Sequence, residues 1–143
     1  MRRTVIALAL AAVLAPSAAR AALNQDDFYI HNAQDLVDLC AAPTGDPLYR
    51  EAIHFCEGFL SGAWQYHMAE TAGPQGQRFV CPPDPPPTRD QVVAMFVTWS
   101  GQHPQRMLEP AVDALFRFAA EKWPCPEETP PPQRPSKKKG GAK

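Results

Sequence analysis

Four cysteines constrain this chain more than any other feature of its sequence. They are Cys40, Cys56, Cys81 and Cys125, and they are spread over much of its 143 residues. An even number of cysteines in a protein that enters an oxidising compartment is typical of a disulfide framework. Two disulfides are therefore expected, and three pairings are possible.

The N-terminal segment indicates that the chain enters such a compartment. Two arginines precede an apolar run over residues 5–15, and small residues follow up to Ala21. This order is typical of a secretory signal peptide, and the apolar run is shorter than the roughly 20 residues that span a bilayer. The sequence predicts a signal peptide over residues 1–21, cleavage before Ala22, and a periplasmic mature protein with no transmembrane segment.

Charge divides the mature chain into two parts. Residues 22–126, the body, contain six Lys or Arg and thirteen Asp or Glu, a formal charge of −7, whereas residues 127–143 are rich in proline and lysine. Because residues 127–143 include no large apolar side chain, they cannot offset the entropy of their own ordering and are expected to form a disordered tail. The acidic body argues against a nucleic acid partner and suits a basic protein partner, with an ordinary solvated surface as the alternative.

Capping residues and hydrophobic periodicity predict two helices in the first half of the body. The first is expected to begin after the N-cap Asn32, and the second after Asp46, running to about Glu70. Gly58 and Gly62 lie four residues apart in the second helix, where each costs roughly 1 kcal/mol. They suggest the close approach of another segment at that point, with tolerated weak spots as the alternative.

Two more helices are expected after a proline-rich loop over residues 71–87. The third begins with a capping box at Thr88, and the fourth covers residues 104–122, where Pro110 is expected to kink the helix or mark its true start. The apolar residues of the fourth helix expected to face the core are Leu108, Ala111, Val112, Leu115, Phe118 and Ala119. The expected fold is a small all-α domain with four helices and two disulfides.

The order of these helices favours one disulfide pairing. If the third and fourth helices are antiparallel neighbours, Cys81 before the third lies near Cys125 after the fourth. The other two cysteines, Cys40 and Cys56, close a short loop. We therefore expect the pairs Cys40 with Cys56 and Cys81 with Cys125, each stabilising by about 3 to 4 kcal/mol in the loop-entropy description.

The residue types that carry catalysis or bind metals show no recognisable pattern. The sequence has no Cys-x-x-Cys pair, and its histidines have neither His-x-x-x-His spacing nor a carboxylate cluster. His54 and His67 lie 13 residues apart in the second helix, too far to bind one metal ion, and are expected to be hydrogen-bonded at the edge of the core. The sequence therefore predicts no catalytic site, no metal site and no cofactor.

The long loop contains an aromatic residue with two interpretations. Phe79 follows Arg78 in a largely polar segment, and aromatic and arginine side chains are enriched in protein interfaces. Arg78 and Phe79 are therefore candidate partner-binding residues, with the alternative that Phe79 packs under its own loop beside Cys81. Three tryptophans on different helices are expected at the core, where they could form one cluster: Trp64, Trp99 and Trp123.

An ordered series of short motifs resembles a known family. The series is Leu36-x-x-Leu39-Cys40, Cys56-x-Gly58-Phe59-x-x-Gly62, Cys81-Pro82, Gln91-Val92-Val93, His103-Pro104 and Trp123-Pro124-Cys125. It resembles the Rap/Tai family of immunity proteins, which are periplasmic helical proteins that neutralise cell-wall amidase effectors delivered by type VI secretion systems. The resemblance covers about residues 28–125. It implies that the chain binds and inhibits such an amidase, as a homodimer and without enzymatic activity.

Two other functions stay open at this point. A periplasmic chaperone of the acid-stress type, or another envelope binding protein, is also helical and disulfide-bonded. Such a chaperone should expose large apolar patches when acidified, whereas an inhibitor should bind one partner tightly at neutral pH. An enzyme whose motifs are not recognisable is the remaining alternative.

Overall fold

The computed structural model describes residues 22–126, so the expected signal peptide (1–21) and tail (127–143) lie outside the described residues. In chain order the elements are the 3-10 turn η1 (Gln25–Phe28), α1 (Ala33–Cys40), α2 (Tyr49–Glu70), α3 (Arg89–Gln102), the 3-10 turn η2 (Pro104–Arg106) and α4 (Ala111–Lys122). The predicted all-α fold with four helices is confirmed. No helix in this part of the chain is long and apolar enough to cross a membrane.

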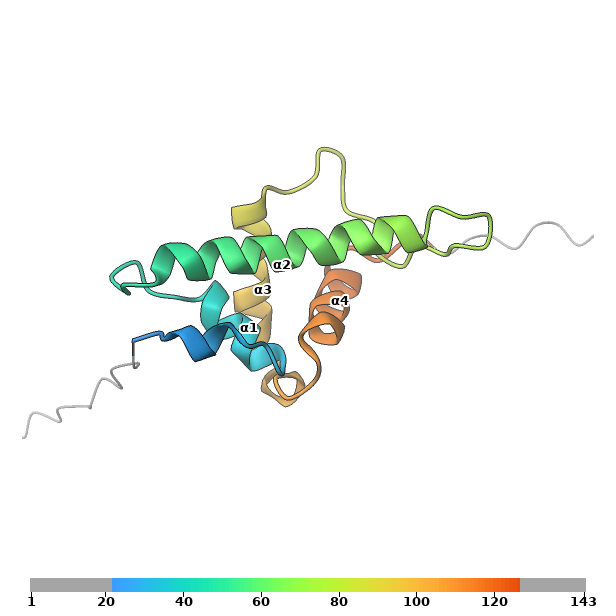
Figure 1. Cartoon of the computed structure of the whole chain (residues 1–143). Coiled ribbons are helices and arrows are strands. Elements are labelled where there is room, and N and C mark those ends of the chain that lie inside the picture. The colour runs from blue at the N-terminus through green and yellow to red at the C-terminus, as the bar shows by residue number, and fades with distance from the viewer. Residues whose placement is uncertain (1–21, 127–143) are drawn as a thin grey trace, which may run out of the picture.

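The shortest α-helix, α1, lies at the centre of the packing. It contacts α2, α3 and α4, and α2 passes across the group as one long rod in Figure 1. The side chains of Leu36 and Leu39 in α1 are completely buried. Phe96 of α3 and Phe118 of α4 belong to the same core as Leu36, with their ring centroids 5.6 Å apart. Burial of each such side chain stabilises the fold by roughly 1.5–3 kcal/mol.

The first two helices differ in how they begin. The side chain of Asn32 accepts hydrogen bonds from the amides of Gln34 (2.8 Å) and Asp35 (3.2 Å), so the predicted N-cap of α1 is confirmed. The predicted N-cap of α2 at Asp46 is wrong, because α2 begins at Tyr49. The carboxylate of Asp46 instead accepts from the amides of Leu23 and Leu48, both at 2.8 Å, and thereby ties the first described residues to the turn before α2.

The predicted fourth helix is divided in two. Pro110 is the N-cap of α4 and marks its true start, because a residue without an N–H cannot continue a helix through its interior. Residues 107–110 form a turn in which Met107 is buried, whereas Leu108 is 86% exposed and Val112 is 40% exposed. The expectation that Leu108 and Val112 face the core is therefore wrong, since the turn shifts the register of the chain.

The two glycines of α2 face open space. A Cβ atom built on Gly58 or on Gly62 would meet no other atom within 4 Å, and both residues are exposed. The expected close approach of another segment is therefore wrong. The core faces of α2 and α1 carry the contacts between these helices, leaving the glycine face of α2 bare.

Two disulfides fasten the helices and the long loop. Cys40 at the end of α1 is joined to Cys56 within α2, and Cys81 in the loop is joined to Cys125 after α4. Beside the second disulfide, the amide of Cys81 donates a 2.8 Å hydrogen bond to the carbonyl of Trp123. In Figure 1 the loop leaves the end of α2, passes the end of α4 and then rises to α3.

The tryptophans do not form one ring cluster. Trp99 and Trp123 both contact the ring of Phe118, at centroid distances of 6.1 Å and 5.7 Å. Trp64 packs against the same core but pairs with His67 at 5.5 Å. The expected cluster thus holds for two of the three side chains, and Trp64 belongs to a separate group of rings near the long loop.

Candidate partner-binding surface

Phe79 lies over the junction of α2 and α4. Its ring contacts His67 of α2 at a centroid distance of 4.5 Å and Phe116 of α4 at 5.5 Å, both edge to face, while 47% of the residue stays exposed. Rings of two helices thus hold Phe79 while about half of the residue faces solvent, and its role in partner binding stays a prediction. Its support comes from α2 and α4 rather than from its own loop.

The residues after Phe79 hold it in place. Val80 is almost completely buried and pairs with Pro124 in an isolated antiparallel bridge, and Cys81 is joined to Cys125. The chain is exposed up to Phe79, whereas Val80 is buried and Cys81 is held in place by its disulfide. A side chain held in this way loses little conformational freedom when it enters an interface, which favours binding.

His67 is buried beneath Phe79. It is only 3% exposed, its Nε2 atom has no hydrogen-bond partner, and the rings of Trp64, Phe79 and Phe116 surround it. Burial, reinforced by the positive charge of Arg78, lowers the pKa of His67 below its ordinary value of 6.5. The expected hydrogen bond is therefore absent at Nε2, and His67 packs as a neutral ring at neutral pH.

His54 differs from His67 although both lie in α2. Its side chain is exposed, and Nδ1 lies 3.9 Å from a carboxylate oxygen of Glu57 one turn away. The expected place at the edge of the core is therefore wrong for His54. The two histidines lie on different faces of the helix, and only His67 belongs to the aromatic group.

An apolar groove lies next to this aromatic group. It has a volume of about 340 Å³ and runs between α2, the proline-rich loop, the start of α3 and α4. Its apolar lining includes Leu60, Trp64, Val80, Val93, Leu115 and Phe116. Phe116 lines the groove and also contacts the ring of Phe79, so Phe79 borders the groove through Phe116. The arrangement offers apolar surface with a held aromatic side chain beside it, which suits protein recognition.

A second cavity, of about 450 Å³, lies between α3 and α4. The polar side chains around it contact one another: the indole of Trp99 donates to Glu121 at 2.7 Å, and Nε2 of His103 lies 3.7 Å from the same carboxylate. In this structure these groups form a closed set of contacts between the two helices.

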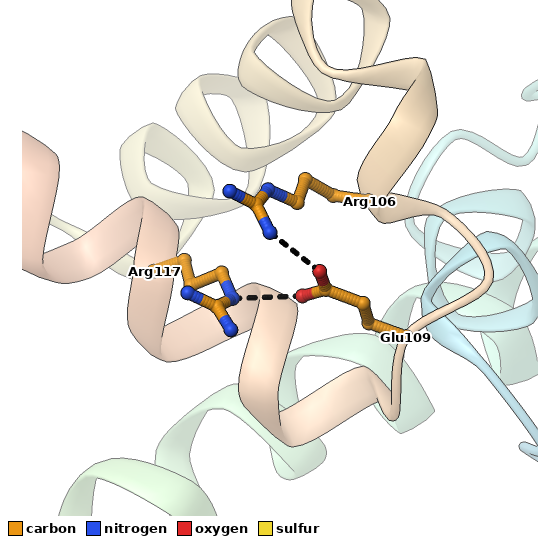
Figure 2. A network of polar contacts seen from close by, with 3 residues as sticks. All are labelled: Arg106, Glu109 and Arg117. Carbon is orange, nitrogen blue, oxygen red and sulfur yellow. Dashed lines mark hydrogen bonds and ion pairs between the residues drawn. The ribbon is translucent and has the colours of Figure 1, made fainter.

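An ionic network fixes the turn before α4. Nη1 of Arg106 and Nε of Arg117 donate to the two carboxylate oxygens of Glu109, at 2.6 Å and 2.7 Å (Figure 2). The hydrogen bond from Arg106, assisted by that from Arg117, holds the pKa of Glu109 below its ordinary value. Glu109 therefore stays ionised and links the turn to the middle of α4.

Residues 22–126 contain no cluster of side chains suited to bind a metal ion. No group of three or more His, Cys, Asp or Glu side chains there could hold a metal ion, and all four cysteines are in disulfides. What the described surface offers is shape, apolar area and charge.

Sequence reasoning missed part of this surface. Helical periodicity does not single out Phe116, and it predicts that Leu108 and Val112 face the core. Two signals point to the outer face of α4: Pro110, which breaks the register of a continuous helix, and the four-residue spacing of Val112 and Phe116. Neither signal shows that Phe79 joins this face, because that contact links segments 37 residues apart.

Comparison with known protein families identifies a related family. The model of the Rap1a immunity proteins matches residues 32–125 of this chain. The matched region begins at the N-cap of α1 and ends at Cys125, so it includes all four α-helices and both disulfides. No curated protein and no solved structure matches.

Proposed function

Because this chain belongs to the Rap1a immunity protein family, we propose that it is a periplasmic immunity protein that binds and inhibits a secreted peptidoglycan amidase. In this role it protects the cell that makes it from an effector delivered by type VI secretion. The chain acts by occupying the effector's substrate cleft and carries out no chemical reaction of its own.

The observation that carries this proposal is the half-exposed ring of Phe79, which packs on Phe116 beside an apolar groove. An inhibitor needs a preorganised feature that can enter a cleft, and Phe79 is held by His67, Phe116 and the disulfide of Cys81. Arg78 beside it supplies a hydrogen-bond donor of the kind enriched at binding hot spots. Family membership supports the immunity role, and this geometry supports Arg78 and Phe79 as contact residues.

The charge of the body supports a particular kind of encounter. Residues 22–126 have a formal charge of −7, which attracts a basic enzyme and repels nucleic acid. Association with a basic amidase should then slow as salt is added, because mobile ions screen this attraction. Both disulfides are compatible with an exported protein.

The direct test uses any secreted amidase that is encoded beside the gene of this chain. The purified mature protein should bind this enzyme and stop its digestion of peptidoglycan, and expression of the chain should protect a producer from it. Light scattering of the free protein tests the homodimer that the family resemblance implies. If the amidase stays fully active and the producer is unprotected, the immunity function is wrong.

The substitution Phe79→Ala tests the contact residues. It should weaken amidase binding by about 2 kcal/mol, or roughly 30-fold in Kd, because it removes an aromatic anchor. It should lower Tm only by a few degrees, since the ring contacts with His67 and Phe116 stabilise by roughly 1 kcal/mol. Tyr29→Ala, at another exposed aromatic residue, is the matched control and should bind as the wild type does. Unchanged binding by Phe79→Ala would remove only the loop assignment.

A further inference from the structure

Exposed apolar side chains form a strip along the outside of α4. Of the five large apolar side chains exposed in residues 22–126, three belong to α4 or to segments beside it: Val112 in α4, Leu108 in the turn before it, and Phe79 in the loop that packs on Phe116. Val112 and Phe116 lie one turn apart on the same face of α4, Leu108 precedes them in the chain, and Phe79 packs on Phe116. We call Leu108, Val112, Phe116 and Phe79 the α4 strip.

The end of the α4 strip at Leu108 is rigid. The carbonyl oxygens of its two neighbours, Met107 and Glu109, accept hydrogen bonds from the amides of Gln34 (3.0 Å) and Ala33 (2.8 Å) at the start of α1. Met107 is also buried in the core. Leu108 is therefore an 86% exposed apolar side chain on a fixed backbone rather than on a loose loop. Leaving such a residue in water has no stabilising effect on the fold.

Arginines gather along the α4 strip, against the overall charge of the body. Three of the six basic residues in 22–126 lie beside it, namely Arg78, Arg106 and Arg117. Glu109 binds one nitrogen of Arg106 and one of Arg117 (Figure 2). Both arginine side chains stay partly exposed. The three arginines, together with the nearby Glu109 and Asp113, have a formal charge of +1, whereas the whole body has a formal charge of −7.

We propose that the α4 strip is a contact surface for the amidase and that it takes an apolar patch of that enzyme with carboxylates on its rim. Aromatic and arginine side chains are enriched at interface centres, and the exposed leucine and valine add apolar area that a partner can bury. The proposal rests on the proposed function and adds the face through which the effector is held. Local charge argues against a second copy of the same strip as the occupant, because the charged residues around it sum to +1 and suit carboxylates better than another positive surface.

The test replaces exposed side chains that do not support the fold. The double variant Leu108→Ser with Val112→Ser should raise the Kd for the purified amidase at least tenfold, with Tm close to the wild-type value. Tyr66→Ser, at an exposed aromatic residue on α2, is the control and should change Kd by less than twofold. Leu108→Ser alone should give an intermediate Kd.

Three results overturn the proposal in distinguishable ways. If the wild type does not bind the amidase, the proposed function fails and the α4 strip loses its partner with it. If the wild type binds and the double variant binds equally well, only the assignment of the strip is wrong. If the double variant binds normally but changes from dimer to monomer in light scattering, the strip is an interface between copies of this chain.

Discussion

At the scale of single residues, His67 links the acidity of the surroundings to the packing around Phe79. A neutral imidazole fits among three aromatic rings, whereas an imidazolium there would carry a charge with no partner at Nε2 and with Arg78 nearby. Protonation therefore opposes the packing of the long loop on α2 and α4.

The sign of this effect can be predicted. The pKa of His67 is lower in the folded protein than its ordinary value of 6.5, so the unfolded chain binds more protons between those two pH values. The free energy of unfolding should therefore fall as pH drops below about 6.5, and this contribution should level off below the folded pKa. Urea unfolding of the wild type and of His67→Leu at pH 7.5 and 5.0 measures it, and the variant should lose less stability.

The exposed His54 offers the matched control for this measurement. His54→Leu lies in the same helix and should keep the acid sensitivity of the wild type. An acid loss in His67→Leu equal to that of the wild type would show that other groups cause it. If the acidified wild type also binds a hydrophobic dye and suppresses the aggregation of other proteins, the result favours the chaperone alternative over the immunity function.

The burial of His67 shows where sequence reasoning stops at this scale. Trp64 and His67 are three residues apart in one helix, so their common face could be predicted. The rings that close over His67 come from the loop and from α4, and such distant contacts leave no mark in local spacing. The hydrogen bond expected for His67 rested only on its position in α2, whereas its surroundings depend on the loop and on α4.

At the scale of elements, local signals located helix starts well. The capping boxes at Asn32 and Thr88 involve residues three apart, so they are readable from sequence and are present in the structure. Asp46 has the same residue type as a cap, but its carboxylate binds the amide of Leu23, which is 23 residues earlier. Pro110 was compatible with either a kink or the true start of the fourth helix. In the structure α4 starts after Pro110, and in the turn before it Met107 packs into the core while Leu108 stays exposed.

The disulfide between Cys81 and Cys125 should control the long loop. Its removal in Cys81→Ala with Cys125→Ala should destabilise by about 4 kcal/mol in the loop-entropy description, because it closes a separation of 44 residues. It should also release the segment beside Phe79, so trypsin should cut after Arg78 several times faster. The double variant Cys40→Ala with Cys56→Ala, across 16 residues, is the control and should lose about 3 kcal/mol.

The two double variants separate local from global effects. The comparison is made at a temperature where circular dichroism shows both variants folded. Equal cutting rates at Arg78 in the two would show that the loop is held by packing rather than by its own disulfide.

At the scale of the whole molecule, the fold is a body of about a hundred residues fastened at two places. The number of helices and the all-α class followed from periodicity, and the two bonds in the structure are the pairs that chain order favoured. The relative placement of α2 and α4 that forms the groove could not be read from any one segment. The signal peptide and the tail stay predictions, because both lie outside residues 22–126.

Export and oxidation can be checked together on protein from the periplasm. Intact-mass analysis should show a chain that begins at Ala22, because small residues precede that position in the pattern of a signal peptidase site. Thiol titration without denaturant should find no reactive cysteine, since all four are bonded. A mass that includes residues 1–21, or two or more reactive thiols, would contradict the exported and oxidised state.

The two disulfides also determine how simply this chain can acquire its bonds. The first cysteine in the chain is bonded to the second and the third to the fourth, so the two loops neither nest nor interlock. A chain that crosses a membrane from its N-terminus presents Cys40 and Cys56 before Cys81 and Cys125. Joining each new arrival to the unpaired cysteine already across therefore produces the native connectivity, so oxidation in order of arrival is sufficient and no later exchange of partners is needed.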